Sequence, residues 1–321
     1  MAVKLGWGVL GTAQIAVNRV IPAIGKSRNG RVVAIASRDL DKARAAGREL
    51  RIAKAYSSYQ AVLDDPDVAA VYIPLPNSLH REWTIRAAEA GKHVLCEKPL
   101  ALSAAEAEEM LAACKAHGVC LMEAFMYRFH PRTQEAARLV REGAVGAVRL
   151  VRASFSSRVT SPTNIRLNAN LGGGALLDSA CYGVNVCRMI LGEPVGVSAE
   201  ATYTGGGVVE TVVGTLRFPD GAFGLIDSSL GMAAQRSYEI VGTEGLITVR
   251  YTAKPGWGTP SIQVRSGRQV ETRRLRGGNH YVLMVRSFAD AVLKVRPMLL
   301  PPEDSVANMR VLDALREAIS V

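Results

Sequence analysis

The residue with the clearest chemical potential is Lys98, which follows the apolar run Val94–Cys96 and precedes Pro99. Proline donates no hydrogen bond to a sheet, so the strand predicted over this run ends here. Lys98 then lies at the carboxyl end of a strand, where open parallel sheets bind their ligands. A surface lysine that merely ends a strand would give the same pattern.

A second pair of reactive side chains follows the three glycines at positions 172–174. Asp178 and Tyr182 are four positions apart in a predicted helix over Ala175–Leu191, so they project from one face. The glycines permit unusual backbone geometry just before the pair. The acid and the phenol could transfer a proton, or the tyrosine could be hydrogen-bonded to the aspartate in an apolar helix. The residues leave both interpretations open.

A turn that could bind a dinucleotide lies near the N-terminus. A literal G-x-G-x-x-G falls on Gly6, Gly8 and Gly11, but its first two glycines would lie inside the first strand. In the frame that starts at Gly11, this glycine makes the turn, Ala13 lets the backbone approach a pyrophosphate and Ala16 permits close packing. The helix predicted from here to residue 24 would offer free amides to phosphates. The expected contacts are Gly11, Thr12, Ala13, Gln14 and Ile15.

The tip of the second strand indicates which dinucleotide is preferred. NAD sites usually have an acid there, which accepts hydrogen bonds from the ribose. This chain has Ser37 and Arg38, a hydroxyl and a guanidinium that suit a 2′-phosphate. Asp39 could still reach the ribose, and Ser37 or Asp39 could instead cap a helix. We therefore favour NADP(H), with NAD(H) as the alternative.

A proline-rich turn after the strand predicted over Val68–Pro74 supplies further candidates. Pro74 and Leu75 could form a wall on the nicotinamide side. Asn77 could cap the next helix, and this role alone would explain it. His80 could approach a phosphate or ribose, although a single histidine in a first helical turn more often has a structural role.

Two patterns of strands and helices divide the chain. In the first third, short apolar runs alternate with amphipathic segments, which predicts βαβ units and a doubly wound parallel sheet. Between residues 148 and 251 six runs read as successive strands separated by turns, and one helix interrupts them. This predicts a second, α+β domain with a largely antiparallel sheet. We place a cofactor domain over residues 1–122 and a substrate and oligomerisation domain over residues 123–321.

Composition narrows the class of protein. The 321 residues are 48% hydrophobic and 21% charged, as is ordinary for globular chains. The net charge is +10, but the arginines are dispersed, so we predict a small-molecule partner rather than nucleic acid. No apolar run reaches the ~18 residues of a membrane span. Five scattered cysteines are typical of a reduced, cytoplasmic protein. We predict no membrane association and no metal site.

Several motifs occur together in one order along nearly the whole chain. They are the N-terminal turn, Asn77-x-x-His80, Ala90–Pro99 with Glu97-Lys98-Pro99, and Gly172–Asp178. This combination resembles the Gfo/Idh/MocA family of NAD(P)-dependent oxidoreductases. Residues 123–131 and Cys181-Tyr182 are similar to the branch with dihydrodiol dehydrogenase, glucose–fructose oxidoreductase and sugar ketoreductases.

The resemblance implies a Rossmann domain and an open-faced C-terminal sheet that forms a homodimer or homotetramer. It implies that Lys98 and Glu97 lie beside the nicotinamide, with a cis bond to Pro99. Tyr182 would exchange a proton with the substrate, next to Asp178, and the residues leave open whether Lys98 does so instead. An arginine that reaches the cofactor in related enzymes corresponds to Arg166.

The expected reaction is hydride transfer between NADP(H) and a hydroxyl or carbonyl carbon of a sugar or similar polyol. A trans-dihydrodiol dehydrogenase, or a reductase of a nucleotide-linked keto sugar, is the alternative within the same chemistry. A non-catalytic regulator that senses NADP, or a glycosidase that uses NAD transiently, are alternatives on the same fold. The lysine, tyrosine and aspartate favour the enzyme over the regulator, and the intact Glu97-Lys98-Pro99 argues against the glycosidase.

Overall fold

The computed structural model describes residues 3–250 and 260–319. Its contacts divide the chain into two compact units. The first comprises Met1–Met126 and Asn279–Val306, and the second comprises Tyr127–Gly278 and Ala307–Val321. The domain boundary predicted between residues 122 and 123 stays a prediction, because compactness does not establish which segments fold independently.

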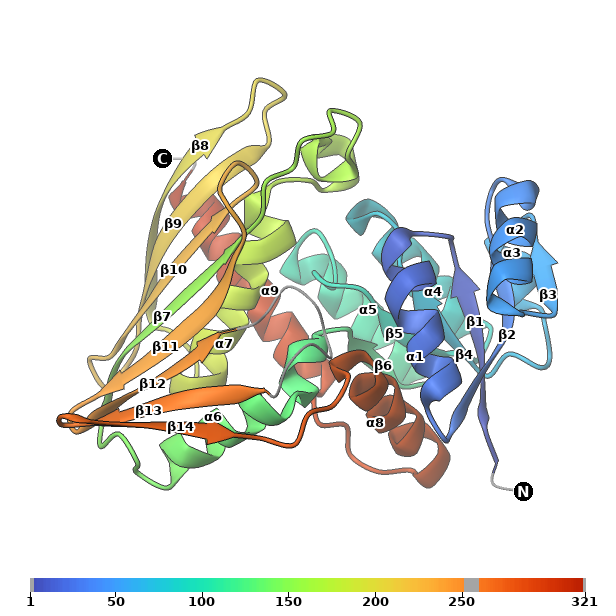
Figure 1. The fold of residues 1–321 in the computed structure, drawn as a ribbon. Coiled ribbons are helices and arrows are strands. Elements are labelled where there is room, and N and C mark those ends of the chain that lie inside the picture. Colours follow the sequence, from blue (N-terminus) through green and yellow to red (C-terminus); the bar gives the residue numbers. More distant parts are fainter. Residues whose placement is uncertain (1–2, 251–259, 320–321) are drawn as a thin grey trace. The chain divides into compact units, whose positions relative to one another are not determined.

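The first unit is built on a parallel sheet. Its described residues form six strands in the order β3-β2-β1-β4-β5-β6, and every neighbouring pair is parallel. The strands are β1 (Leu5–Leu10), β2 (Gly30–Ala36), β3 (Lys54–Tyr56), β4 (Ala70–Ile73), β5 (His93–Cys96) and β6 (Leu121–Glu123). The strand order reverses between β1 and β4, which is where doubly wound sheets bind ligands. The predicted Rossmann sheet is confirmed (Figure 1).

The first unit also contains helices. They are a π-helix (Ala16–Val20), α1 (Ile21–Lys26), α2 (Leu40–Leu50), α3 (Tyr59–Leu63), a 3-10 turn (Asn77–Leu79), α4 (His80–Glu89), α5 (Ala104–Ala116) and α8 (His280–Lys294). A capping interaction starts α5, where the Ser103 hydroxyl accepts from the Glu106 amide at 3.3 Å. Although α8 is distant in sequence, Phe288 packs on Trp7 of β1 with ring centroids 5.2 Å apart. The core of the first unit therefore includes a helix from the end of the chain.

The second unit has a larger sheet. In the described residues its eight strands run in the order β14-β13-β12-β11-β7-β10-β9-β8. The strands are β7 (Val148–Ser156), β8 (Gly196–Tyr203), β9 (Val209–Arg217), β10 (Phe223–Ser229), β11 (Gln235–Gly242), β12 (Gly245–Arg250), β13 (Ser261–Ser266) and β14 (Gln269–Arg274). Only β7 and β10 pair in parallel among these described strands. The predicted, largely antiparallel sheet is confirmed; residue 251, in the last predicted run, lies outside the described residues.

One face of this sheet is covered and the other is open. The helices of the unit are α6 (Pro131–Arg141), α7 (Cys181–Leu191) and the part of α9 (Pro302–Ala318) from residue 307 onward. Figure 1 shows α6 and α7 on the same face of the sheet. The packing is close, since a Cβ on Gly183 of α7 would lie 3.0 Å from Ile226 Cγ2 of β10. On the other face of β10, Phe223 and Leu225 are 43% and 39% exposed. The open face agrees with the prediction.

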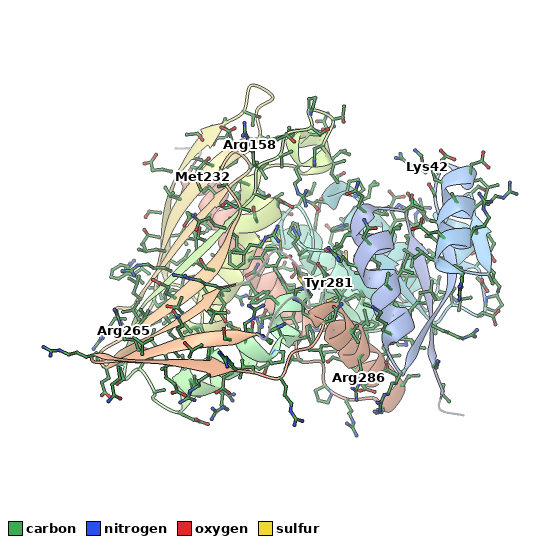
Figure 2. All side chains as sticks on the ribbon, viewed as in Figure 1. Lys42, Arg158, Met232, Arg265, Tyr281 and Arg286 are labelled. Atoms are coloured by element: carbon green, nitrogen blue, oxygen red, sulfur yellow. The ribbon has the colours of Figure 1, made fainter. Side chains whose placement is uncertain are left out.

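Surface charge is distributed over many segments. Figure 2 labels basic side chains on four of them: Lys42 on α2, Arg286 on α8, Arg158 after β7 and Arg265 on β13. Within residues 3–250 and 260–319, no helix combines the length and the apolarity that crossing a bilayer requires.

Candidate active site

The turn after β1 is built on Gly11. Gly11 has φ = +121°, which favours glycine, and a Cβ there would lie 3.3 Å from Leu75 Cδ2. Gly6 and Gly8 lie inside β1, and a Cβ on Gly6 would lie only 2.2 Å from the Asp67 carbonyl oxygen. These two glycines permit close packing, so the literal G-x-G-x-x-G is misleading and Gly11 alone belongs to the turn.

The residues after Gly11 lead into a helix that starts irregularly. Thr12, Ala13 and Ile15 are half-buried and Gln14 is exposed. The Val17 amide donates to the Ala13 carbonyl at 3.1 Å, and amides that precede such a first helical bond are the ones an anion can use. Residues 16–20 then form a π-helix instead of the α-helix predicted from the sequence.

The residues that follow β2 differ in what they contact. The Asp39 carboxylate caps α2 by accepting from the amides of Asp41 and Lys42 at 3.1 and 3.2 Å. The buried Ser37 hydroxyl accepts from the Asp39 amide at 3.2 Å. Arg38 between them is exposed. The acid is thus engaged by its own helix, while the guanidinium is available at the edge of the sheet.

His80 connects two turns at the same edge. Its side chain is fully buried, with Nδ1 2.9 Å from the Pro99 carbonyl oxygen and Nε2 2.9 Å from that of Leu75. Burial lowers the pKa of this imidazole. Both ring nitrogens therefore face backbone carbonyls, and His80 joins the turn after β4, with Pro74 and Leu75, to the turn after β5. Asn77 begins the 3-10 turn that leads into α4.

Lys98 follows β5, the strand between β4 and β6, and is half-buried. Its bond to Pro99 is cis, as the resemblance implied. The neighbouring carboxylate of Glu97 is held from behind, because the fully buried Tyr72 of β4 donates its hydroxyl to Glu97 Oε1 at 2.5 Å. Burial and the Glu97 charge both raise the pKa of Tyr72. The Tyr72 hydroxyl thereby holds the Glu97 side chain in place next to Lys98.

A buried carboxyl, Glu123, ends β6 next to this turn and was not among the predicted site residues. It pairs with Cys96 of β5 and is 1% exposed. Burial raises its pKa to about 8, and the Ser305 side chain, the Leu100 backbone and, more weakly, the positive charge of Lys98 oppose this rise.

In the second unit, the three glycines fold a loop against the start of a helix. Gly172 and Gly174 have φ of +75° and +107°, and the Gly174 amide donates to the Arg166 carbonyl at 2.8 Å. A Cβ on Gly173 would lie 2.5 Å from the same carbonyl oxygen. This close approach brings Arg166 to Asp178, and their side chains pair with Nε 2.8 Å from Oδ2.

Tyr182 lies in the first turn of α7, in an aromatic setting. Its ring stacks on Phe155 of β7 with centroids 5.3 Å apart and planes at 21°. Tyr127 contacts it at 5.8 Å with planes at 59°. Asp178 precedes α7 in a π-helix, Leu176–Ala180, so the helix predicted over this stretch again starts with a π turn. Such π segments are frequent at functional sites.

Sequence reasoning missed Tyr72, Glu123, Phe155 and Tyr127 as parts of these arrangements. Tyr72 and Glu123 end apolar strands beside the predicted edge, which is a signal that could have found them. Phe155 and Tyr127 approach Tyr182 only through tertiary packing.

Comparisons with known proteins agree with this geometry. Residues 5–125 match the oxidoreductase family with an NAD-binding Rossmann fold, and residues 133–248 match the GFO/IDH/MocA C-terminal domain. D-xylose 1-dehydrogenase (NADP(+)) 2 of Haloferax volcanii is 40% identical over 316 residues, which are 97% of this chain and 96% of the relative. The chain belongs to the GFO/IDH/MocA family.

Solved structures of family members are similar over the whole length. A 3-ketoreductase from Actinomadura kijaniata, in complex with NADP and TDP-benzene, has a TM-score of 0.92 at 32% identity and covers 98% of both chains. The aldose-aldose oxidoreductase from Caulobacter crescentus, complexed with glycerol, has a TM-score of 0.92 at 31% identity, over 99% of this chain and 98% of the other. This GFO/IDH/MocA member is an oxidoreductase with an NAD(P)-binding Rossmann sheet, which favours the enzyme over the regulator.

Proposed function

We propose that the protein transfers a hydride between NADP(H) and a hydroxyl or carbonyl carbon of an aldose or related polyol. The observation that supports this most is the placement of Lys98 at the carboxyl end of β5, beside a Glu97 that Tyr72 holds. A half-buried amine at this edge can reach the atoms that react.

The first unit fits a dinucleotide. A turn at Gly11 with no side chain lets a pyrophosphate approach the backbone, and the helix after it supplies amides. Pro74 and Leu75 suit the nicotinamide side, since Leu75 lies against the Gly11 turn. When bound, the nicotinamide supplies the acceptor or donor of hydride.

The tip of β2 supports NADP(H) over NAD(H). An NAD site needs a carboxylate for the ribose hydroxyls, but Asp39 uses its carboxylate to cap α2. Ser37 and Arg38 remain to bind a 2′-phosphate, which a guanidinium binds strongly.

We assign the proton transfer to two residues. Structures of the A. kijaniata ketoreductase with NADP and TDP-benzene include variants with one lysine or one tyrosine replaced. That lysine and tyrosine are as far apart in sequence as Lys98 and Tyr182 are here, at 84 positions. We assign Tyr182 and Lys98 to take the proton from the substrate hydroxyl in oxidation, or to return it in reduction. Whether Tyr182 or Lys98 holds the proton stays open.

Asp178 and Arg166 complete the proposed site in the second unit. Their ion pair fixes the carboxylate one turn before Tyr182, where it can orient a polyol by accepting hydrogen bonds from it. The same pair holds Arg166 at the start of this helix, and its assignment to the cofactor rests on the family resemblance.

The substrate class rests on the relatives. A dehydrogenase of D-xylose and an aldose-aldose oxidoreductase favour a free aldose. The second candidate is a trans-dihydrodiol, because the trans-1,2-dihydrobenzene-1,2-diol dehydrogenase of Xenopus laevis is 35% identical over 78% of this chain and 76% of its own length.

We also propose that the open sheet face forms a homodimer or homotetramer. Phe223, Leu225 and Val213 are exposed there among polar neighbours, and such an apolar face favours association. Leu225→Asp should then lower the mass that light scattering measures, with the helical content unchanged.

The test of function is nicotinamide absorbance with purified protein, NADP⁺ or NAD⁺, and a panel of aldoses, inositols and dihydrodiols. We expect turnover with NADP⁺ and at least one aldose, D-xylose being the first to try. Turnover of a dihydrodiol alone would select the second candidate. Tight NADP⁺ binding with no turnover across the panel would contradict the proposed reaction.

A further inference from the structure

The chain topology brings a tyrosine next to the proposed 2′-phosphate site. Strands β2 and β3 are parallel neighbours whose ends pair, Ala36 with Tyr56, and the Ser37 amide donates to the Tyr56 carbonyl at 3.2 Å. Parallel strands end at one edge of the sheet. Arg38 and Tyr59 follow these paired ends by two and three residues, so they emerge at the same edge.

Tyr59 is held in place from two sides. It is the first residue of α3. Ser58 caps this helix, because its hydroxyl accepts from the Ala61 amide at 3.2 Å. Its ring meets Trp83 of α4 edge-on, with centroids 5.0 Å apart and planes at 88°. Trp83 in turn lies under the Arg86 guanidinium, 5.0 Å from the ring centroid. The phenol is thus a fixed group, because both the backbone and the ring are packed.

The Arg38 guanidinium acts electrostatically on the Tyr59 phenol. Burial raises the pKa of Tyr59, and the charge and hydrogen-bonding contact of Arg38 oppose that rise. Arg38 is exposed, and a long exposed side chain loses rotamer freedom when it binds an anion. A neighbour that already restricts it reduces that loss.

We propose that Tyr59 is a positioning residue that sets the preference for NADP(H) over NAD(H) by holding Arg38 toward the 2′-phosphate. This inference rests on the proposed cofactor site at Ser37 and Arg38. It assigns no chemical step to Tyr59, and it predicts an effect on the phosphate-bearing nucleotide alone.

The first experiment measures the dissociation constants of NADP⁺ and NAD⁺ by calorimetry for the wild type and Tyr59→Phe. The variant keeps the ring against Trp83 and removes only the hydroxyl. We expect the NADP⁺ constant to rise about fivefold, as for the loss of one modest hydrogen bond, with less than a twofold change for NAD⁺. The matched control is Tyr56→Phe in the neighbouring strand β3, which removes a hydroxyl that donates to Asp65 and should leave the ratio of the two constants unchanged.

A double-mutant cycle with Arg38→Ala tests the route of the effect. If Tyr59 acts through Arg38, Tyr59→Phe has no further effect on NADP⁺ binding once the guanidinium is absent. An equal fivefold loss in both backgrounds, or an unchanged ratio in the single variant, would overturn the inference. Failure of the proposed function would look different, since the wild type itself would then bind neither nucleotide or prefer NAD⁺.

Discussion

The two units place their candidate residues by different means. In the first unit, Gly11, Ser37, Arg38 and Lys98 follow the carboxyl ends of strands of one parallel sheet, so sheet topology alone brings their backbones to one edge. In the second unit, Asp178 and Tyr182 depend on a glycine-rich loop, a π turn and aromatic packing. The first arrangement follows from strand order, whereas the second depends on particular side chains.

The difference implies that the units should respond differently to substitution. A change at the sheet edge removes one function and leaves the fold intact, because strands fix the backbone. A change in the loop of the second unit alters both the geometry and the function, because Gly173 and Arg166 support each other.

The largest expected effect is that of Lys98→Ala. If Lys98 takes part in proton transfer, kcat should fall about a thousandfold, within the range for general acid–base groups. Cofactor affinity, measured by calorimetry, should change little. Lys42→Ala is the control, since Lys42 lies exposed on α2 of the same unit (Figure 2). A kcat within threefold of the wild type would remove Lys98 from the chemistry.

Tyr182→Phe tests the second unit in the same assay, and we expect kcat to fall about a hundredfold. The ring stacked on Phe155 stays in place, so the melting temperature should be unchanged. Tyr203→Phe serves as control, because its hydroxyl donates to the Ile319 carbonyl at the end of the unit. A normal kcat in Tyr182→Phe would mean that Tyr182 takes no part in the chemistry.

The sequence was sufficient for the parts of the molecule that periodicity controls. The parallel sheet and the lysine before Pro99 followed from patterns of apolar residues and breakers. The sequence also distinguished the turn at Gly11 from the literal G-x-G-x-x-G, because Gly6 and Gly8 fall inside a predicted strand.

Other features could not be predicted from periodicity. Strand β3 lacks a buried run, since Lys54–Tyr56 are all half-buried. Whether Asp39 or Ser37 capped α2 was left open, because both types cap helices. The contacts of His80 and Tyr72 join segments 19 and 25 residues away in sequence, and local patterns do not encode such pairings.

Glu123→Gln should change how stability depends on pH. The carboxyl pKa is raised by burial to about 8 in the folded chain, against about 4.3 in an unfolded one. The folded state therefore binds more protons between these values, and the wild type loses stability as pH rises from about 4.5 to 8. Relative to Glu123→Gln, the loss over this window should be at most about 5 kcal/mol. Parallel pH profiles from urea unfolding would contradict a neutral buried carboxyl.

A smaller effect is expected at the first strand. Gly6→Ala should cost about 1–3 kcal/mol of unfolding free energy, because its Cβ would meet the Asp67 carbonyl oxygen. The dissociation constant of NADP⁺ should stay the same, since Gly6 lies outside the turn. Gly25→Ala in α1 is the matched control, with no atom within 4 Å of the new Cβ, and should be neutral or stabilising. If Gly6→Ala weakened the binding of NADP⁺ at unchanged stability, Gly6 would belong to the cofactor site and this prediction would be wrong.

The most direct test of the account is the double variant Lys98→Ala/Tyr182→Phe, because we propose that Lys98 and Tyr182 serve the same proton transfer. Substitutions of residues that act together in one step have strongly non-additive effects on the rate. We predict a kcat/KM for the double variant within about threefold of that of Lys98→Ala alone, measured with the aldose that the panel identifies. A loss equal to the product of the two single losses would contradict a shared step and show that Lys98 and Tyr182 act independently.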